Sequence, residues 1–187
     1  LERLRNVPGV NAAGIVTNIP LYGGSSTGFE VAGRPEALPG QRPMTDYRLT
    51  SPDYFTAMGM RLVKGRAFSH HDNEAAPGVV IINETLAARY FTGEDPIGKR
   101  LNLSGEPRDL REIVGVIADV RNYGVDEEVK PEVYVPFFQS APDYLASQTS
   151  AMTIVVRSAI DPTGFAAALR EQVQALDKDQ PVSAIKT

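Results

Sequence analysis

A short apolar segment in the middle of the chain predicts a buried strand. Val79 to Ile82 are four consecutive β-branched residues, and they directly follow the turn-forming pair Pro77-Gly78. Such a run is typical of a strand that is covered on both faces of its sheet. Asn83 comes next, and its short polar side chain suits the N-cap of a helix. Apolar residues then recur at helical spacing, at Leu86, Ala87, Tyr90 and Phe91. We therefore expect a buried strand that passes directly into a short amphipathic helix.

Further strands are expected on both sides of this unit. Apolar or alternating segments predict strands at residues 10–17, 29–32, 44–49, 60–63, 113–120, 132–138, 151–157 and 181–185. Pro136 lies inside one of these segments, and since proline cannot donate to a ladder, that strand is expected at a sheet edge. Residues 21–28 are rich in glycine and serine and are expected to form a flexible loop.

Helix start signals occur twice more. Ser51-Pro52-Asp53 combines an N-cap serine, a proline at the first helical position and an early acid, and Gly59 is expected to end that short helix. Asp161-Pro162 has the same pattern of an N-cap residue followed by proline, and it precedes an apolar stripe that runs from Phe165 to Leu176. Residues 1–6 have the pattern of the end of a helix.

This order of elements predicts an α+β fold whose first part is discontinuous in the sequence. We expect one α/β subdomain from residues 1–76 and 150–187, and a mainly β subdomain inserted between them at residues 77–149. Such an arrangement leaves the two ends of the chain close together in space. Since the chain begins in a helical pattern and stops without a closing element, we expect it to be a portion of a longer protein.

Composition excludes several classes of function. The 187 residues carry a formal net charge of −4, which argues against a basic surface for nucleic acid. The chain has no cysteine, so it can form neither a disulfide framework nor a cysteine-based metal site. An apolar run of about 18 residues, as a membrane span needs, does not occur in the sequence.

Candidate catalytic and metal-binding groups are few. The only histidines lie in His70-His71-Asp72, where adjacent residues seldom converge on one ion, so a solvated turn is the better interpretation. A Gly-x-Ser-x-Gly nucleophile motif and a Walker motif are both absent. Loop acids could pair as acid and base for glycoside hydrolysis, but solvated acids are the commoner case; they are Asp119, Asp126, Glu127 and Glu128. We expect no catalytic residue, cofactor or metal ligand.

Phe137 and Phe138 are the candidate contact residues. Most aromatic residues fit core positions of the predicted elements, but two successive residues of a strand cannot both face the same core. An exposed apolar side chain at this point would suit a contact with a partner protein.

Several short motifs together resemble the extracytoplasmic domain of MacB/FtsX-type ABC transporter permeases. The residues that carry the resemblance span nearly the whole chain: Ser51-Pro52-Asp53-Tyr54-Phe55, Met58-Gly59-Met60, Gly65-Arg66-Ala67-Phe68, Val80-Ile81-Ile82-Asn83-Glu84, Phe91, Asp95-Pro96-Ile97-Gly98-Lys99, Ile113-Val114-Gly115-Val116 and Val133-Tyr134-Val135-Pro136. The resemblance implies a porter-like subdomain with an inserted, mainly β, Sabre-like subdomain. It also implies a location on the extracytoplasmic (periplasmic) face of the bacterial cytoplasmic membrane, between the first two transmembrane helices of the permease.

The expected function is the relay of an ATP-driven conformational change to substrate or partner proteins outside the membrane. The ATPase would be a separate domain or chain. Expected partners are the transmembrane helices of the same permease, the ATP-binding subunit, a second permease copy and a periplasmic accessory protein. The alternative is an extracytoplasmic ligand-binding or hydrolase-like module, with its site in the loop at residues 21–28 or near Asp126. A pocket with convergent polar groups would favour this alternative.

Overall fold

The computed structural model describes residues 1–21, 24–38, 40–103, 109–124, 126–140, 152–159, 166–175, 178, 182 and 185–186. Its strands are β1 (Val10–Val16), β2 (Ser25–Gly28), β3 (Glu30–Val31), β4 (Met44–Thr50), β5 (Leu62–Gly65), β6 (Val79–Asn83), β7 (Arg100–Asn102), β8 (Leu110–Ile117), β9 (Glu132–Pro136) and β10 (Thr153–Ser158). Its helices are α1 (Glu2–Arg5), α2 (Tyr54–Met58), α3 (Glu84–Tyr90), the 3-10 helix η1 (Phe137–Gln139) and α5 (Ala166–Gln174). Among these described helices, none has the length and apolar character that crossing a bilayer requires.

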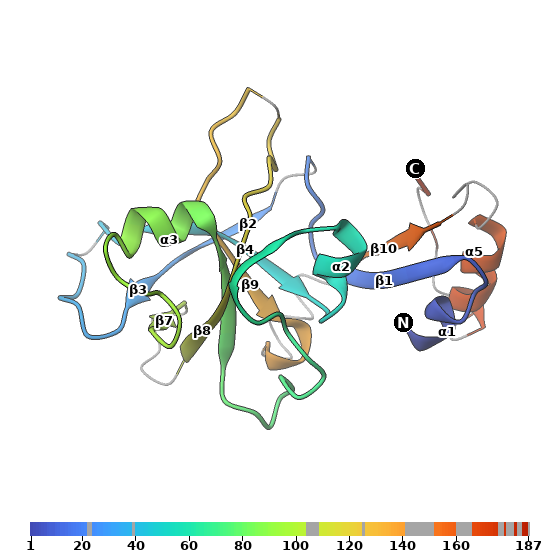
Figure 1. Cartoon of the computed structure of the whole chain (residues 1–187), viewed down its shortest axis with the longest axis horizontal. Coiled ribbons are helices and arrows are strands. Elements are labelled where there is room, and N and C mark those ends of the chain that lie inside the picture. Colours follow the sequence, from blue (N-terminus) through green and yellow to red (C-terminus); the bar gives the residue numbers. More distant parts are fainter. Residues whose placement is uncertain are drawn as a thin grey trace.

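All of these strands belong to one mixed sheet. The order along the sheet is β10-β1-β4-β9-β6-β8-β7-β3, while β2 pairs with β4 and β5 pairs with β8 outside this path. Two pairs are parallel, β4 with β9 and β6 with β8, and the others are antiparallel. The mixed sheet with its few helices confirms the predicted fold class (Figure 1).

The position predicted for β9 is wrong. Pro136 does not hold this strand at an edge, because β9 lies between β4 and β6 and pairs with both. Pro136 is the last residue of the strand, opposite Thr50, and the chain then enters η1. A proline at the end of a strand costs the ladder little, so it does not exclude a central position.

The predicted loop at residues 21–28 is also partly wrong. Ser25–Gly28 form β2, which pairs along its whole length with the first half of β4. Small polar residues have little intrinsic preference for strands, so this pairing depends on the neighbouring β4. Tyr22 and Gly23 lie outside the described residues.

The apolar run that predicts a buried strand is β6, and it is buried on both faces. Val80 and Ile82 pack in one cluster, below α3, while Val79 and Ile81 pack in the other, below α2. Strand β9 alternates in the same way, since Val133 belongs to the α3 side and Tyr134 to the α2 side. The sheet therefore has a core on each face, as a two-sided apolar strand requires.

The predicted cap of α3 is confirmed, and the one predicted for α2 is not. The side chain of Asn83 accepts a hydrogen bond of 2.9 Å from the amide of Leu86. In α2 the N-cap position belongs to Asp53, without a side-chain bond, and the Ser51 hydroxyl instead accepts from the amide of Ile15 in β1. Gly59 ends α2 in the left-handed conformation, with φ of 70°, as expected.

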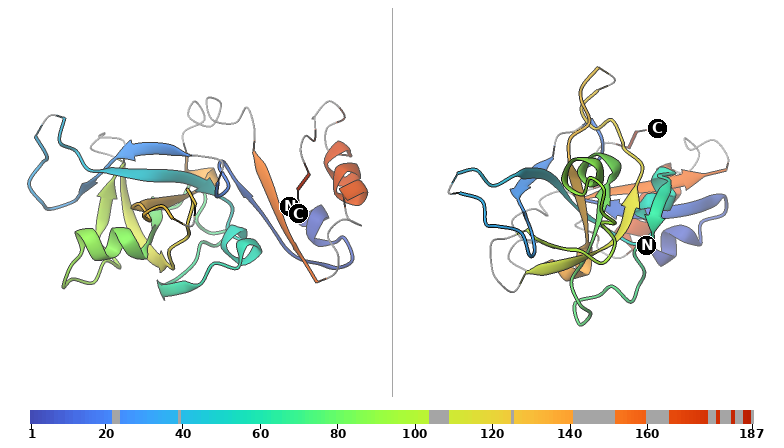
Figure 2. Two further views of the ribbon diagram at one scale, coloured as in Figure 1. Left: turned by 90° about the horizontal axis from the view of Figure 1, so that it is seen from above. Right: turned by 60° about the vertical axis from the view of Figure 1, so that its left-hand side comes forward.

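The first and last parts of the chain lie side by side. Strands β1 and β10 pair over their length, and α1 contacts α5 next to them (Figures 1 and 2). Both views place Leu1 and residues 185–186 at this same end of the long axis, which agrees with the expectation that the two ends are close. The predicted helix start at residues 161–162 and most of the closing strand at 181–185 lie outside the described residues.

The predicted division at residue 77 stays a prediction. Both apolar clusters combine side chains from the two predicted subdomains, since Phe29 and Leu49 pack with Val80, and Phe55 packs with Ile81. The terminal pair of strands meets β4 over a short stretch, where Val16 pairs with Thr50 and hydrogen bonds join Thr17 to Leu49 and Ser51 to Ile15. We call the terminal strands with α1 and α5 the terminal unit, and the described residues of 24–140 other than α2 the main body.

Candidate functional site

The predicted contact residues lie in η1 rather than in a strand. Phe137 packs partly against the cluster below α3, whereas the Phe138 side chain is 64% exposed. The two rings meet edge to face, with centroids 5.6 Å apart. A contact role for this pair remains a prediction, and the exposure makes Phe138 the better placed of the two.

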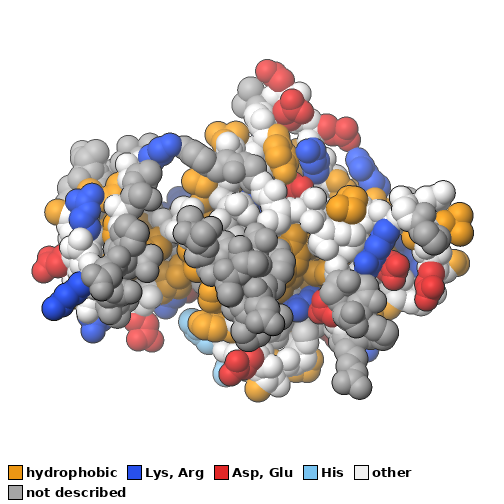
Figure 3. Space-filling model, turned by 180° about the vertical axis from the view of Figure 1, so that it is seen from behind, with side chains coloured by type: hydrophobic (Ala, Val, Ile, Leu, Met, Phe, Trp, Pro, Cys, Tyr) orange, Lys and Arg blue, Asp and Glu red, His pale blue; other side chains and the backbone are white. Residues whose placement is uncertain are grey.

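The histidine-containing turn holds a structural ion pair. His70 and His71 are exposed, and histidine side chains reach the surface in Figure 3. Asp72 is buried instead, where its carboxylate accepts two hydrogen bonds of 2.8 Å from the Arg66 guanidinium and one of 2.7 Å from the Ser69 amide. Within the described part of the chain, no group of three or more histidine and acidic residues could hold a metal ion.

An Asp72→Asn variant tests this ion pair. Burial by itself raises the pKa of Asp72, but the hydrogen bonds from Arg66 and Ser69 outweigh it and hold the pKa below its ordinary value of 3.8. The pair therefore contributes stability above pH 3.8, and this contribution is lost as the pH falls through the lower pKa of the folded state. The variant should lose about 1–3 kcal/mol of unfolding free energy at pH 7, measured by urea denaturation, and the loss should shrink below pH 3.8.

The control is Glu74→Gln, which removes an exposed acid from the same segment. It should leave the unfolding free energy near that of the parent at every pH. A loss in Asp72→Asn that stays constant down to pH 3 would contradict the role given to the carboxylate charge.

The four loop acids do not form a catalytic pair. Asp119 accepts hydrogen bonds from the amide and hydroxyl of Thr85, at 3.0 and 2.7 Å, and so stabilises the first turn of α3. Glu128 lies 3.1 Å from Arg89, and Asp126 and Glu127 are exposed. Each of these acids has the surroundings of a solvated or capping residue.

A buried polar network at the centre of the sheet is the main feature that the sequence did not reveal. Arg48 of β4 and Glu132 of β9 form an ion pair, and each is 1% exposed. Glu132 also accepts hydrogen bonds from the Asn122 amide, at 2.9 Å, and from the Tyr134 hydroxyl. The guanidinium of Arg48 makes a further hydrogen bond to the carbonyl of Asn18, just after β1. The network thus joins three parts of the chain.

Strand register explains why these polar groups meet. Strands β4 and β9 are parallel, with Asp46 opposite Glu132 and Arg48 opposite Tyr134. Alternate residues share a face of the sheet, so all four side chains lie on the same side. Each segment alone shows only one or two charged residues in an apolar pattern, which is equally compatible with exposure.

The tyrosines of the network are hydrogen-bond donors at neutral pH. Burial, reinforced by the charge of Glu132, raises the pKa of Tyr134 well above its ordinary value, and burial likewise raises the pKa of Tyr54. Burial and a hydrogen bond of 2.7 Å to Asp46 raise the pKa of Tyr123 to about 12. The hydroxyls of Tyr134 and Tyr123 donate to the carboxylates of Glu132 and Asp46, and the second of these hydrogen bonds joins β4 to the segment near residue 123.

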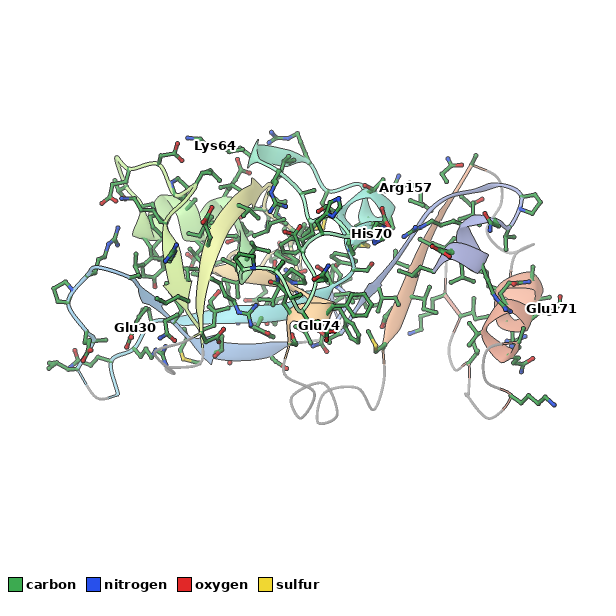
Figure 4. The ribbon with its side chains drawn as sticks, turned by 90° about the horizontal axis from the view of Figure 1, so that it is seen from below. Glu30, Lys64, His70, Glu74, Arg157 and Glu171 are labelled. Carbon is green, nitrogen blue, oxygen red and sulfur yellow. The ribbon has the colours of Figure 1, made fainter. Side chains whose placement is uncertain are left out.

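Helix α2 connects the terminal unit to the main body. On the side of the main body, the rings of Tyr54 and Phe55 pack against Tyr134, with centroids 6.3 and 5.2 Å apart. On the other side, the Arg157 guanidinium of β10 donates a hydrogen bond of 2.9 Å to the carbonyl of Ala57 (Figure 4). Arg5 of α1 forms an ion pair with Asp53 at the start of the helix.

The backbone of α2 also lies directly against β1. A Cβ atom added at Gly14 would be 2.5 Å from the Cα atom of Tyr54 and 2.8 Å from its amide nitrogen. Only glycine permits so close an approach of strand and helix backbones. The α2 junction, defined by Gly14, Arg157, Ala57 and Tyr54, is therefore a tightly packed link between the two parts of the molecule.

Comparison with known proteins gives matches over most of the chain. Residues 1–172 match the family described as MacB-like periplasmic core domain. The curated relative "Uncharacterized ABC transporter permease YknZ" of Bacillus subtilis strain 168 is 30% identical over 108 residues. That match covers 58% of this chain but only 26% of the relative, so the chain corresponds to a limited part of that permease.

Three solved structures share the fold of this chain. A domain of a Porphyromonas gingivalis protein assigned as a permease has a TM-score of 0.62 at 20% identity, covering 97% of this chain and 77% of that one. The extracellular domain of the ABC-type transporter YknZ from Gram-positive bacteria has a TM-score of 0.59 at 17% identity, covering 95% and 80%. The periplasmic region of MacB from Actinobacillus actinomycetemcomitans has a TM-score of 0.56 at 16% identity, covering 94% and 89%.

Proposed function

We propose that this chain, which belongs to the MacB-like periplasmic core domain family, relays an ATP-driven conformational change from the membrane part of its permease to molecules outside the membrane. The family is described as a periplasmic core domain, and its curated relative is an ABC transporter permease.

The observation that carries the proposal is the α2 junction. A terminal unit that contains the first and the last of the described strands is joined to the main body through the short β1–β4 pairing around Val16, the Asn18–Arg48 hydrogen bond and the packed helix α2. A displacement of the terminal unit would act on the main body through α2, because the contacts at Gly14 and Ala57 leave little space for slippage. Switching by rigid-body rotation about such an interface is a common mechanism.

The same proposal implies several partners in the intact permease. The transmembrane helices would continue from the two ends of the chain, an ATP-binding subunit or domain would act on them, and a second permease copy would face this one. An accessory protein outside the membrane would contact the main body, where Phe138 presents an exposed apolar side chain.

Distance measurements in the intact permease test the relay. In a permease whose cysteines outside these 187 residues are replaced, a Lys64→Cys substitution places one spin label on β5 of the main body, and Arg3→Cys places one on α1 of the terminal unit. Lys64 is half exposed and its ion pair with Asp95 is on the surface, so the label should not disturb the fold (Figure 4). Distances between the spin labels of the two copies should change on ATP binding. The change should be larger at Lys64 than at Arg3, because the main body lies farther from the two chain ends, where the motion would enter the domain.

Two results would contradict the relay. Unchanged distances at Lys64 in a permease that hydrolyses ATP normally would show that the main body does not move. Equal changes at Lys64 and Arg3 would show that the whole domain shifts without rotating, so that α2 does not convert a movement of the terminal unit into a rotation of the main body.

A further inference from the structure

An open pocket of about 420 Å³ lies beside the buried network, on the main body. It is formed where β2 and β4 approach α3 and the segment before β9. The residues that line it include Gly24, Thr45, Asp46, Arg89, Tyr123 and Lys130. A volume of this size is enough for a ligand of a few hundred daltons, and the lining is mainly polar.

Behind Gly24, in the wall of the pocket, lies the buried guanidinium of Arg48, one nitrogen of which lacks a hydrogen-bond acceptor. The Nε and Nη1 atoms of Arg48 bond to Glu132 and to the carbonyl of Asn18, but the Nη2 atom is buried without an acceptor among the described residues. A buried guanidinium nitrogen without an acceptor is costly, because it has given up its hydration. This donor therefore favours an acceptor group that approaches from the pocket.

Gly24 keeps that approach open. A Cβ atom at this position would lie 3.6 Å from Arg48 Nη2 and 3.7 Å from the Tyr123 hydroxyl, so even a small side chain would fill the space between them. Arg48 Nη2 is the donor that lacks an acceptor at this point, whereas the Tyr123 hydroxyl already donates its hydrogen to Asp46.

Two cationic side chains border the pocket. Lys130 Nζ lies 4.0 Å from the centroid of the Tyr123 ring, and Arg89 pairs with Glu128, whose side chain is 84% exposed. An exposed pair of this kind is weak, so Arg89 can exchange Glu128 for another anion at little cost. Asp46 supplies a single carboxylate to the lining, and the Tyr123 hydroxyl already donates to it.

We propose that this pocket binds a small carboxylate that also carries an amine, as a free amino acid or a dipeptide does. The ligand carboxylate would lie between Lys130, Arg89 and the Arg48 donor behind Gly24, and the amine would lie toward Asp46. Charge-assisted hydrogen bonds of this kind are stronger than neutral ones and select for a charged ligand end. The proposal does not depend on the relay of motion.

Titration of the 187-residue chain with the dipeptide Ala-Ala, followed by NMR shifts of backbone amides, tests the site. Shifts should concentrate at Gly24, Thr45 and Tyr123. The dipeptide amide, which lacks the carboxylate, should bind at least about tenfold more weakly. N-acetylated Ala-Ala, which lacks the amine, should also bind more weakly, and the size of that loss measures the part played by Asp46.

Substitutions distinguish binding in this pocket from nonspecific attraction of anions to the protein surface. Lys130→Met should weaken binding at least about threefold, and Gly24→Leu should abolish it by filling the pocket while the amide spectrum stays that of a folded protein. Lys99→Met is the matched control, since this half-exposed lysine pairs with Glu94 away from the pocket. Equal binding of the amide, an equal effect of Lys99→Met, or no shift at the pocket residues with any of the three probes would each overturn the proposal.

Discussion

An Arg48→Met variant is expected to lose about 3–5 kcal/mol of unfolding free energy at pH 7. The substitution removes the partner of Glu132 while the carboxylate stays buried among the apolar residues of β9. The remaining donors, Asn122 and Tyr134, can bond the carboxylate but cannot neutralise its charge. Guanidinium denaturation of the parent and the variant measures the difference. A domain of this size is seldom more stable than about 5–15 kcal/mol, so the loss would be a large fraction of the total.

The pH dependence shows whether the loss comes from charge or from packing. Burial raises the pKa of Glu132, and removal of the Arg48 charge raises it further. A raised pKa in the folded state means that the folded variant takes up a proton that the unfolded chain does not, so its stability relative to the parent recovers as the pH falls through that pKa. The deficit should therefore shrink between pH 7 and pH 4.5.

The control for Arg48→Met is Arg89→Met, which removes an arginine from an exposed pair and should change stability by less than about 1 kcal/mol. A deficit in Arg48→Met that is the same at all pH values would indicate lost packing of the arginine stem. A deficit no larger than that of Arg89→Met would show that the buried network contributes nothing specific to the fold.

A Gly14→Ala variant is expected to lose about 3 kcal/mol, a large effect for one methyl group. The new Cβ atom would lie 2.5 Å from the Cα atom of Tyr54, and backbone atoms on both sides of the contact cannot move independently. Helix α2 would have to separate from β1, which also weakens the contacts of α2 with β10. Thermal denaturation of the isolated chain gives the stability. In the intact permease, the ATP-dependent change at a Lys64 label should become smaller.

Gly24→Ala is the matched control, since the added Cβ atom would meet no atom closer than 3.6 Å. It should be near neutral, because alanine also restricts the unfolded chain. If Gly14→Ala proved as mild as Gly24→Ala, the α2 junction would be looser than the contact distances require. If Gly14→Ala were destabilised but the Lys64 label moved as in the parent, motion would reach the main body by another route.

The buried strand and helix at residues 79–90 illustrate what could be predicted. The β-branched run, the cap at Asn83 and the apolar stripe of α3 all depend on residues within about one or two helical turns of each other. Interactions of this range are present in the sequence itself, so pattern and propensity are sufficient to find them. The same holds for Gly59, whose left-handed conformation ends α2.

The candidate site could not be found in this way. The predicted contact pair proved to lie in η1, and the network and the pocket combine residues from β4, the segment near residue 123 and β9. A proline within an apolar segment favours an edge strand, but Pro136 stands at the last position of β9, where it leaves the pairing of the strand intact. Ser51 has the local pattern of an N-cap, whereas in the fold its hydroxyl accepts a hydrogen bond from the Ile15 amide of β1, 36 positions away.

The sequence alone determined the local elements, the mixed composition of the fold and, through its motifs, the family to which the chain belongs. Only the tertiary structure decided which polar groups are buried together and where helix α2 packs. Arg48 and Glu132 are 84 positions apart, and nothing near either residue reveals its partner. The free energy of burying a charge depends on the groups that surround it in space, and that environment exists only after distant strands have paired.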